Sequence, residues 1–248
     1  MHQAKTLSQR ADEIEENQIR ALGDRIVAKA PLYQLADGRI PISPGLGSGQ
    51  FLMGEDPRLP KMPDKPTLLD FFRLRFSASQ QHLLQSANLA QKNGLDEKMV
   101  LTCLLHDIAI IGFIRSDHGY WGAQLLEPYV DEEVSWAIRM HQCLRFYPDE
   151  SVGYAYPETY LRLFGADYRP DPYIEADYRR ARKHKWYMSA RMICVNDLYS
   201  FDDNVQVSLD QFEDVVGRHF KQPKEGLGND NTAASHMWRT IIRPANVL

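Results

Sequence analysis

The feature that most constrains this sequence is the dipeptide His106-Asp107, which directly follows the apolar run from Met99 to Leu105. The length and composition of that run are typical of a buried helix, so the dipeptide would lie in a hydrophobic core. A buried, unpaired charge costs several kcal/mol. The two side chains therefore need partners, which are either a metal ion or the local hydrogen bonds of a helix end.

The composition narrows the class of protein. The 248 residues, 44% hydrophobic and 25% charged, are ordinary for a globular protein of one large or two small domains. A net charge of -4 gives no general attraction to nucleic acid or anionic membranes. No apolar run reaches about 18 residues, and no apolar signal segment stands at the N-terminus. We therefore expect a cytoplasmic protein with no nucleic-acid or membrane partner. Three cysteines are expected to be buried and free: Cys103, Cys143 and Cys194.

The pattern divides the chain into residues 1–66 and residues 67–248. In the first part, Thr6 to Ala30 is amphipathic and predicts a helix that packs on the body of the protein or on another copy of the chain, as in a homodimer. Residues 31–65 are rich in Pro and Gly and predict an irregular arm. Such an arm is either a linker or a segment laid over a site.

The second part predicts helices and no strands, so the expected fold class is all-α. Helices are expected over 67–75, from a capping box of Ser77 and Gln80 to a stop at Gly94, from an Asp96 cap to Leu105, after a cap at Ser116 or Asp117, after an Asp131 cap, over about 174–199 with a break, and over 208–220. Residues 147–177, rich in Tyr and Pro, predict a surface excursion with one short helix near 157–164.

Several polar residues occupy expected helix faces that should be apolar. Asp197 lies on the stripe of Ile193 and Cys194, and His141 shares a face with Ile138 and Arg145. With the dipeptide, six ligand-type residues result: His82, His106, Asp107, His118, His141 and Asp197. Imidazole with carboxylate suits iron, manganese or zinc. One metal would need only four of these residues, so six favour two metals with a bridging carboxylate.

These residues stand in motifs that resemble the HD-domain superfamily, whose hallmark is a distant His, a His-Asp pair and a later Asp. The resemblance is greatest to the mixed-valent diiron oxygenases, specifically those that cleave phosphonates, with myo-inositol oxygenase more distant. It covers about residues 79–203. The similar strings are Q-H-L-L-Q-S-A around His82, L-L-H-D-I, D-H-G-Y-W-G-A around His118, I-R-M-H around His141, and Asp197 itself. The spacings also fit, with 24 residues from His82 to His106 and 56 from His141 to Asp197.

The resemblance implies an HD-type helical bundle that holds two iron ions and uses O2 as co-substrate. His82, His106, Asp107 and Asp197 would hold one iron, and Asp107, His118 and His141 the other, with Asp107 bridging. A hydroxyl group of a small-molecule substrate would bind at one iron and O2 at the other. Arg145, in place of a lysine of the family, and Gln85, one turn after His82, are expected to contact the substrate.

The sequence also departs from the phosphonate-cleaving relatives. Ala109 and Ile110 replace a Gly-His pair after the His-Asp pair, and Cys194 replaces a basic residue. Both changes remove expected phosphonate contacts. Arg75 stands where relatives often carry a glutamate that occupies the site, which suggests a different substrate or gate. For Arg145, an anionic substrate and a surface salt bridge remain equal alternatives.

Three functions are compatible with the pattern. The leading interpretation is a non-haem diiron oxygenase that oxidises or cleaves a small hydroxylated, anionic molecule, with Asp107 and Arg145 as the catalytic residues. The alternative is an HD-type metal-dependent phosphohydrolase acting on a phosphoester or nucleotide, which would need more cations than Arg145 to stabilise phosphoryl charge. The third is a helical scaffold stapled by a closed metal site.

Overall fold

The structure is a computed structural model that describes residues 60–76, 80–109, 117–158, 160–161, 165–198, 200, 202 and 204–242. Within these residues the regular elements are helices and no strand occurs, apart from an isolated bridge between Asp149 and Tyr154. The predicted all-α class is confirmed. The expected helix over 6–30, the arm up to residue 59 and the capping residues Ser77 and Ser116 lie outside the described residues. None of the described helices combines the length and apolarity needed to cross a bilayer.

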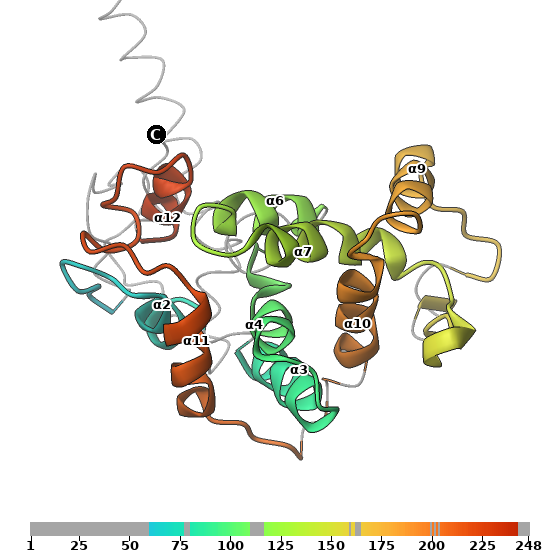
Figure 1. Cartoon of the computed structure of the whole chain (residues 1–248), viewed down its shortest axis with the longest axis horizontal. Helices are drawn as coiled ribbons and strands as arrows, with labels where there is room; N and C mark the ends of the chain where they lie inside the picture. Colours follow the sequence, from blue (N-terminus) through green and yellow to red (C-terminus); the bar gives the residue numbers. More distant parts are fainter. Residues whose placement is uncertain are drawn as a thin grey trace, which may run out of the picture.

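Four helices pack on one another at the centre of the molecule, and two more pack on one of them (Figure 1). The central helices are α3 (Gln80–Lys92), α4 (Glu97–Leu105), α7 (Glu132–Leu144) and α10 (Tyr187–Asp197). Both α6 (His118–Leu126) and α9 (Pro172–Ala181) contact α7. Their buried faces contribute to one hydrophobic core, to which α4 supplies every residue from Met99 to Leu105 except Thr102. The apolar run before the His-Asp pair is therefore a buried helix, as predicted.

The ends of the helices follow the expected local chemistry in some places and not in others. Asp96 caps α4 by accepting a hydrogen bond from the Met99 N–H at 2.9 Å, and Gly94 has the positive φ of 73° that ends the preceding helical segment. Asp117 and Asp131 occupy the N-cap positions of α6 and α7, but neither side chain forms the predicted cap. Each carboxylate has another partner: Asp117 accepts a hydrogen bond from the Tyr173 hydroxyl, and Asp131 forms an ion pair with Lys98.

A second group of helices packs beside α4, through α11 (Figure 1). It contains α2 (Leu68–Leu74), the 3-10 helix η3 (Leu209–Phe212), α11 (Glu213–His219) and α12 (Ser235–Ile242). The first three match the predicted helices over 67–75 and 208–220. Helix α12 was not predicted, because it is short and follows a polar stretch. The buried Trp238 fixes it in the core, with its ring 4.6 Å from that of Phe71.

The Tyr- and Pro-rich region between α7 and α9 is only partly a surface excursion. It contains the short 3-10 helix η2 (Glu150–Val152). Asp149 and Tyr154 are buried, and the carboxylate of Asp149 accepts hydrogen bonds from Tyr187 and Arg182. The prediction of a surface segment was therefore wrong for these two residues, whose buried contacts anchor the start of α10.

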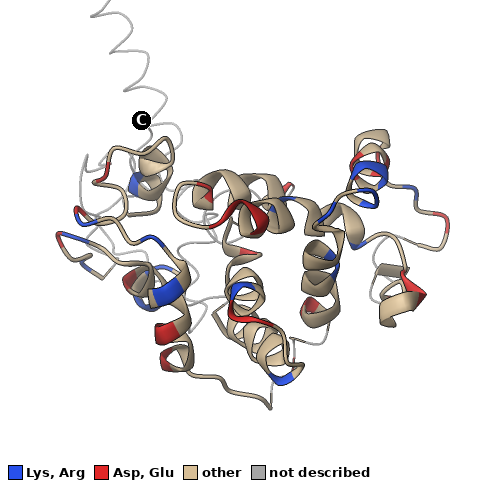
Figure 2. Cartoon of the chain, viewed as in Figure 1, with Lys and Arg blue, Asp and Glu red and all other residues tan. Residues whose placement is uncertain are grey.

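The last turn of α9 and the segment that joins α9 to α10 are rich in Lys and Arg. Figure 2 shows Lys and Arg close together at the end of α9 and in the segment after it. Three of these arginines form ion pairs with nearby acids, Arg179 with Glu175, Arg180 with Asp177 and Arg182 with Asp149. The charges are thus balanced in part by local carboxylates, as on an ordinary solvated helix end.

Candidate metal centre

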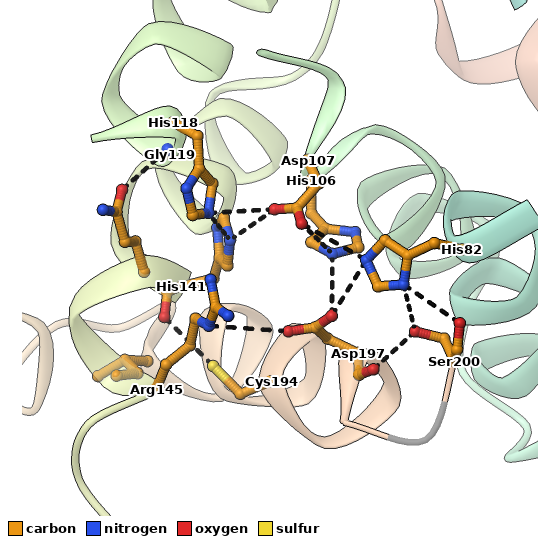
Figure 3. Close-up of polar contacts among 12 residues, drawn as sticks. His82, His106, Asp107, His118, Gly119, His141, Arg145, Cys194, Asp197 and Ser200 are labelled. Atoms are coloured by element: carbon orange, nitrogen blue, oxygen red, sulfur yellow. Dashed lines mark hydrogen bonds and ion pairs between the residues drawn. The ribbon is translucent and has the colours of Figure 1, made fainter. Parts of the chain in front are cut away.

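All six predicted ligand residues converge on one place in the core (Figure 3). They come from five segments far apart in the sequence. Each residue stands at or near one end of a helix, and these helix ends meet in the core. His106 and Asp107 follow the last residue of α4, His118 opens α6, and Asp197 ends α10. His82 is half-buried and the other five are buried. Neither Asp197 nor His118 points into solvent, so the predicted convergence of these side chains is present in the structure.

Four of these residues form a first group of potential ligand atoms, His82, His106, Asp107 and Asp197. The Nε2 atom of His82 lies 3.1 Å from Asp197 Oδ1 and 3.4 Å from Asp107 Oδ2. The Nε2 atom of His106 lies 3.5 Å and 3.6 Å from the same two oxygens. Two imidazoles and two carboxylates therefore surround one point.

A second group shares Asp107 with the first and adds His118 and His141. The two imidazole Nε2 atoms lie 3.1 Å and 3.3 Å from Asp107 Oδ1, and 3.1 Å from each other. Figure 3 shows the Asp107 carboxylate between the two groups. Its Oδ2 faces the first group and its Oδ1 faces the second. A carboxylate placed in this way can bridge two ions.

These separations match the spacing of atoms that share a metal ion. Donor atoms about 2.1 Å from one ion lie about 3.0 Å apart at right angles and about 3.4 Å apart at tetrahedral angles. Two of the buried donors, His106 Nε2 and Asp107 Oδ1, have no hydrogen-bond partner among the described residues. Buried polar atoms without such a partner are rare and costly. The donor set therefore fits two cations of the iron, manganese or zinc type.

The hydrogen bonds of three imidazoles point Nε2 toward the two groups. In each ring the other nitrogen lies against a backbone carbonyl, His106 Nδ1 at 2.7 Å from Cys103 O, His141 Nδ1 at 2.6 Å from Ile138 O, and His82 Nδ1 at 3.2 Å from Ser200 O. A carbonyl only accepts, so Nδ1 carries the hydrogen in the neutral ring. In the neutral form of each ring Nε2 keeps its lone pair for a metal. Burial by itself would lower the pKa of His82, but the Asp107 and Asp197 carboxylates raise it to about 10, so this ring releases a proton when a cation binds.

The electrostatics keep the two carboxylates ionised. Burial by itself would raise the pKa of Asp107, but the adjacent His106 and His118 hold it well below its usual range. The pKa of Asp197 is likewise lowered, against its burial, by His106 and His82. Burial lowers the pKa of His141 to about 4, so that ring is neutral at pH 7. Ionised carboxylates and a neutral imidazole are the forms that bind metal.

Arg145 lies beside the first group, as its helical spacing predicted. Its Nε is 3.9 Å from Asp197 Oδ2, and its guanidinium lies over the Tyr160 ring at 5.2 Å. The Tyr154 hydroxyl donates to the Arg145 carbonyl at 3.0 Å, which fixes the end of α7. The Arg145 side chain keeps 24% of its surface exposed, so part of it faces out of the core. Among the described residues, the ion-pair partner of Arg145 is the buried Asp197 and not a surface acid.

The approach of α6 to α7 depends on Gly119. A Cβ atom there would lie 2.8 Å from the Ile138 carbonyl oxygen, closer than real contacts allow, and 3.0 Å from the Arg139 carbonyl oxygen, which is also tight. The Gly119 N–H also donates to Gln142 Oε1 at 3.0 Å. The missing side chain therefore lets the two helices come close enough to place His118 beside His141.

Two other predicted residues have structural partners instead. Gln85 donates to the Asp202 and Val205 carbonyls at 2.8 and 2.7 Å and accepts from the Asp202 N–H. Because its amide binds backbone in this way, substrate contact by Gln85 gains no support and stays a prediction. In the sequence, Arg75 suggests a different substrate or gate; in the structure it is buried and donates to three carbonyl groups, of Pro60, Leu74 and Ile242. It joins the end of α2 to α12.

Sequence reasoning missed Ser200, Tyr160 and Gly119 as parts of the site. Ser200 follows the end of an expected helix, where no face can be assigned. Tyr160 lies on the short helix expected near 157–164, in a Tyr- and Pro-rich region where no period distinguishes one face. The spacing of Gly119 and Gly122 on an expected helix was a usable signal, since paired small residues allow close helix packing.

No protein-family model matches this sequence, and a comparison with curated proteins finds no relative.

Proposed function

We propose that this chain is an HD-type dinuclear metalloenzyme, a non-haem diiron oxygenase that acts on a small hydroxylated, anionic substrate. The observation that carries the proposal is the division of Asp107, whose two oxygens face two separate groups of imidazole donors. A site for one ion needs no such division. The motif resemblance to mixed-valent diiron oxygenases supports iron among the metals that this donor set suits.

The proposed ligands divide as the sequence motifs imply. His82, His106 and Asp197 would hold one iron, His118 and His141 the other, and Asp107 both. When bound, the pair of irons would supply the one-electron redox chemistry by which O2 is used. The chain itself fixes the donors in advance, since the carbonyl contacts at Nδ1 present three imidazoles with Nε2 inward. This lowers the entropy lost when the ions bind.

Arg145 is the residue that supports an anionic substrate. In the part of the chain that the structure describes, it is the one Lys or Arg paired with a ligand carboxylate. Its Nε has no hydrogen-bond partner there, and Tyr160 covers one face of the guanidinium. A substrate carboxylate or phosphonate could accept from this guanidinium while its hydroxyl group reaches the metal pair. A phosphohydrolase would be expected to place more than one cation here.

The experiment that tests the proposal is metal analysis followed by magnetic resonance. Protein loaded anaerobically with Fe2+ is expected to hold about two irons per chain, because six donors form two groups. Partial oxidation should then give a half-integer-spin signal from a mixed-valent pair. One zinc and no iron in the purified protein would overturn the proposal. Hydrolysis of phosphoesters without that signal would identify a phosphohydrolase instead.

A further inference from the structure

We propose that Ser200 is a positioning residue of the first ligand group, and that its hydroxyl, together with its own carbonyl group, holds the His82 imidazole in its metal-binding tautomer while joining His82 to Asp197. The proposal rests on the metal centre described above. Ser200 is itself no ligand, since its side chain lies on the outer side of His82 (Figure 3). It is buried, with 1% of its surface exposed.

The direction of each hydrogen bond follows from the single hydrogen of a hydroxyl group. Ser200 Oγ lies 2.6 Å from the Asp197 carbonyl oxygen, which can only accept, so the hydroxyl donates there. Toward His82 Nδ1, at 2.9 Å, the same oxygen must therefore accept. Nδ1 then carries the hydrogen, and Nε2 presents its lone pair to the first group. The Ser200 carbonyl oxygen, 3.2 Å from the same nitrogen, also accepts, so the hydroxyl and the carbonyl of one residue favour the tautomer in which Nε2 faces the metal.

The same hydroxyl couples two ligands that come from different helices. His82 stands on α3, whereas Asp197 is the last residue of α10. The Ser200 backbone N–H also donates to the Asp197 carbonyl at 3.0 Å, so Ser200 caps the end of α10. A displacement of α10 therefore moves Ser200 and, through it, the His82 ring.

Two glutamines near His82 on α3, Gln81 and Gln85, bind the backbone of the segment that follows Ser200. Gln85 bonds to the backbone of Asp202 and Val205. Gln81 exchanges two hydrogen bonds with Val207, donating to its carbonyl at 3.0 Å and accepting from its N–H at 2.9 Å. The Q-H-L-L-Q string thus combines one ligand with two amides that fix the residues around the Ser200 contact.

The test compares Ser200→Thr with Ser200→Val. Both substitutions add bulk at a buried position, but only threonine keeps the hydroxyl, so their difference reports the hydrogen bonds. Ser200→Ala serves as a third variant without added bulk. Ser135→Ala is the matched control, because it removes another buried hydroxyl, which donates to the Glu132 carbonyl on α7 without touching a ligand. The full chain is titrated anaerobically with Fe2+ against a chromogenic chelator.

We expect two iron affinities for the wild type, the Thr variant and the Ser135→Ala control. In the Val and Ala variants one affinity should fall by about 10-fold to 100-fold, as for other losses of second-layer partners, while the other stays unchanged. Equal affinities in the Thr and Val variants would overturn the role of Ser200. So would a parallel fall of both affinities with the unfolding free energy, since it would reduce Ser200 to a helix cap.

The outcomes also separate this inference from the proposed function. If the wild type binds no iron, the proposed function fails and the role of Ser200 fails with it. If the wild type binds two irons and the hydroxyl makes no difference, only the role of Ser200 is lost.

Discussion

Substitution of Gly119 by alanine tests whether close packing of α6 on α7 creates the second ligand group. The new Cβ would meet two backbone oxygens of α7 at 2.8 and 3.0 Å, and backbone cannot rotate away as a side chain can. The helices must separate by a few tenths of an ångström. His118 is the first residue of α6 and would move with it. Its Nε2 is 3.1 Å from both His141 Nε2 and Asp107 Oδ1. The second group should therefore open.

The expected loss of stability is small. Overpacking of a well-packed contact costs about 1–3 kcal/mol. Replacing a helical glycine by alanine returns about 1 kcal/mol. Gly119→Ala should thus lower the free energy of unfolding by about 0–2 kcal/mol, so the protein stays folded. The effect on metal binding is the decisive one, with about one iron per chain retained in place of two.

Two other glycines of the chain provide matched controls. At Gly122, on the same helix, the nearest atom to a new Cβ is the Ile138 Cγ2 at 3.4 Å, an ordinary contact with a side chain. Gly122→Ala should keep both metals. At Gly217 on α11 nothing lies within 4 Å, so Gly217→Ala should stabilise by about 0.5–1 kcal/mol. Urea unfolding and elemental analysis measure both quantities. Two irons in the Gly119→Ala protein would refute the role of close packing.

Three further variants test other parts of the structure. His118→Ala should lose one metal and most activity but keep the fold, because the first group stays complete; two metals by elemental analysis would contradict the assignment. Arg145→Leu should weaken substrate binding by roughly 1.5–3 kcal/mol through loss of a charged hydrogen bond, and unchanged apparent affinity would remove its proposed role. The Glu97 carboxylate accepts hydrogen bonds from Arg218, which has the larger effect, and from His219. Together they lower the pKa of Glu97 to about 2 from an ordinary 4.5. The folded state thus favours the carboxylate, so Glu97→Gln should be less stable than wild type above about pH 4.5, with the difference shrinking as pH falls toward 2; a constant difference across that range would exclude this linkage.

Much of the helical architecture could be predicted because its causes are local. The Asp96 cap, the positive φ of Gly94 and the apolar run before His106 are determined within a few residues, and each prediction was confirmed. Local rules failed where a distant residue competed. The Asp117 carboxylate had the type and position of a cap, but Tyr173 on α9 donates to it instead. Helix α12 was not predicted because distant contacts stabilise it, those of Trp238 with Phe71 and Tyr129.

The meeting of the six histidine and aspartate residues was predictable for a different physical reason. A histidine or aspartate on an apolar face needs a partner, and that need is visible in one helix at a time. The identity of that partner is not visible in one helix, because the two oxygens of Asp107 face imidazoles from different helices on opposite sides. Arg75 shows the limit of such reasoning. Its position seven residues before His82 suggested a different substrate or gate, yet it donates to the backbone carbonyl groups of Pro60, Leu74 and Ile242.

The distinction between one metal and two therefore rests on packing rather than on ligand identity. The first group is held by α3, α4 and α10, with Ser200 joining two of its members. The second depends on α6 alone to bring His118 against His141, at a contact that tolerates no side chain on Gly119. A chain with the same six ligands and a bulkier residue at 119 would keep the first group and lose the second. We therefore expect Gly119 to be as necessary for binding of a second cation as His118 itself.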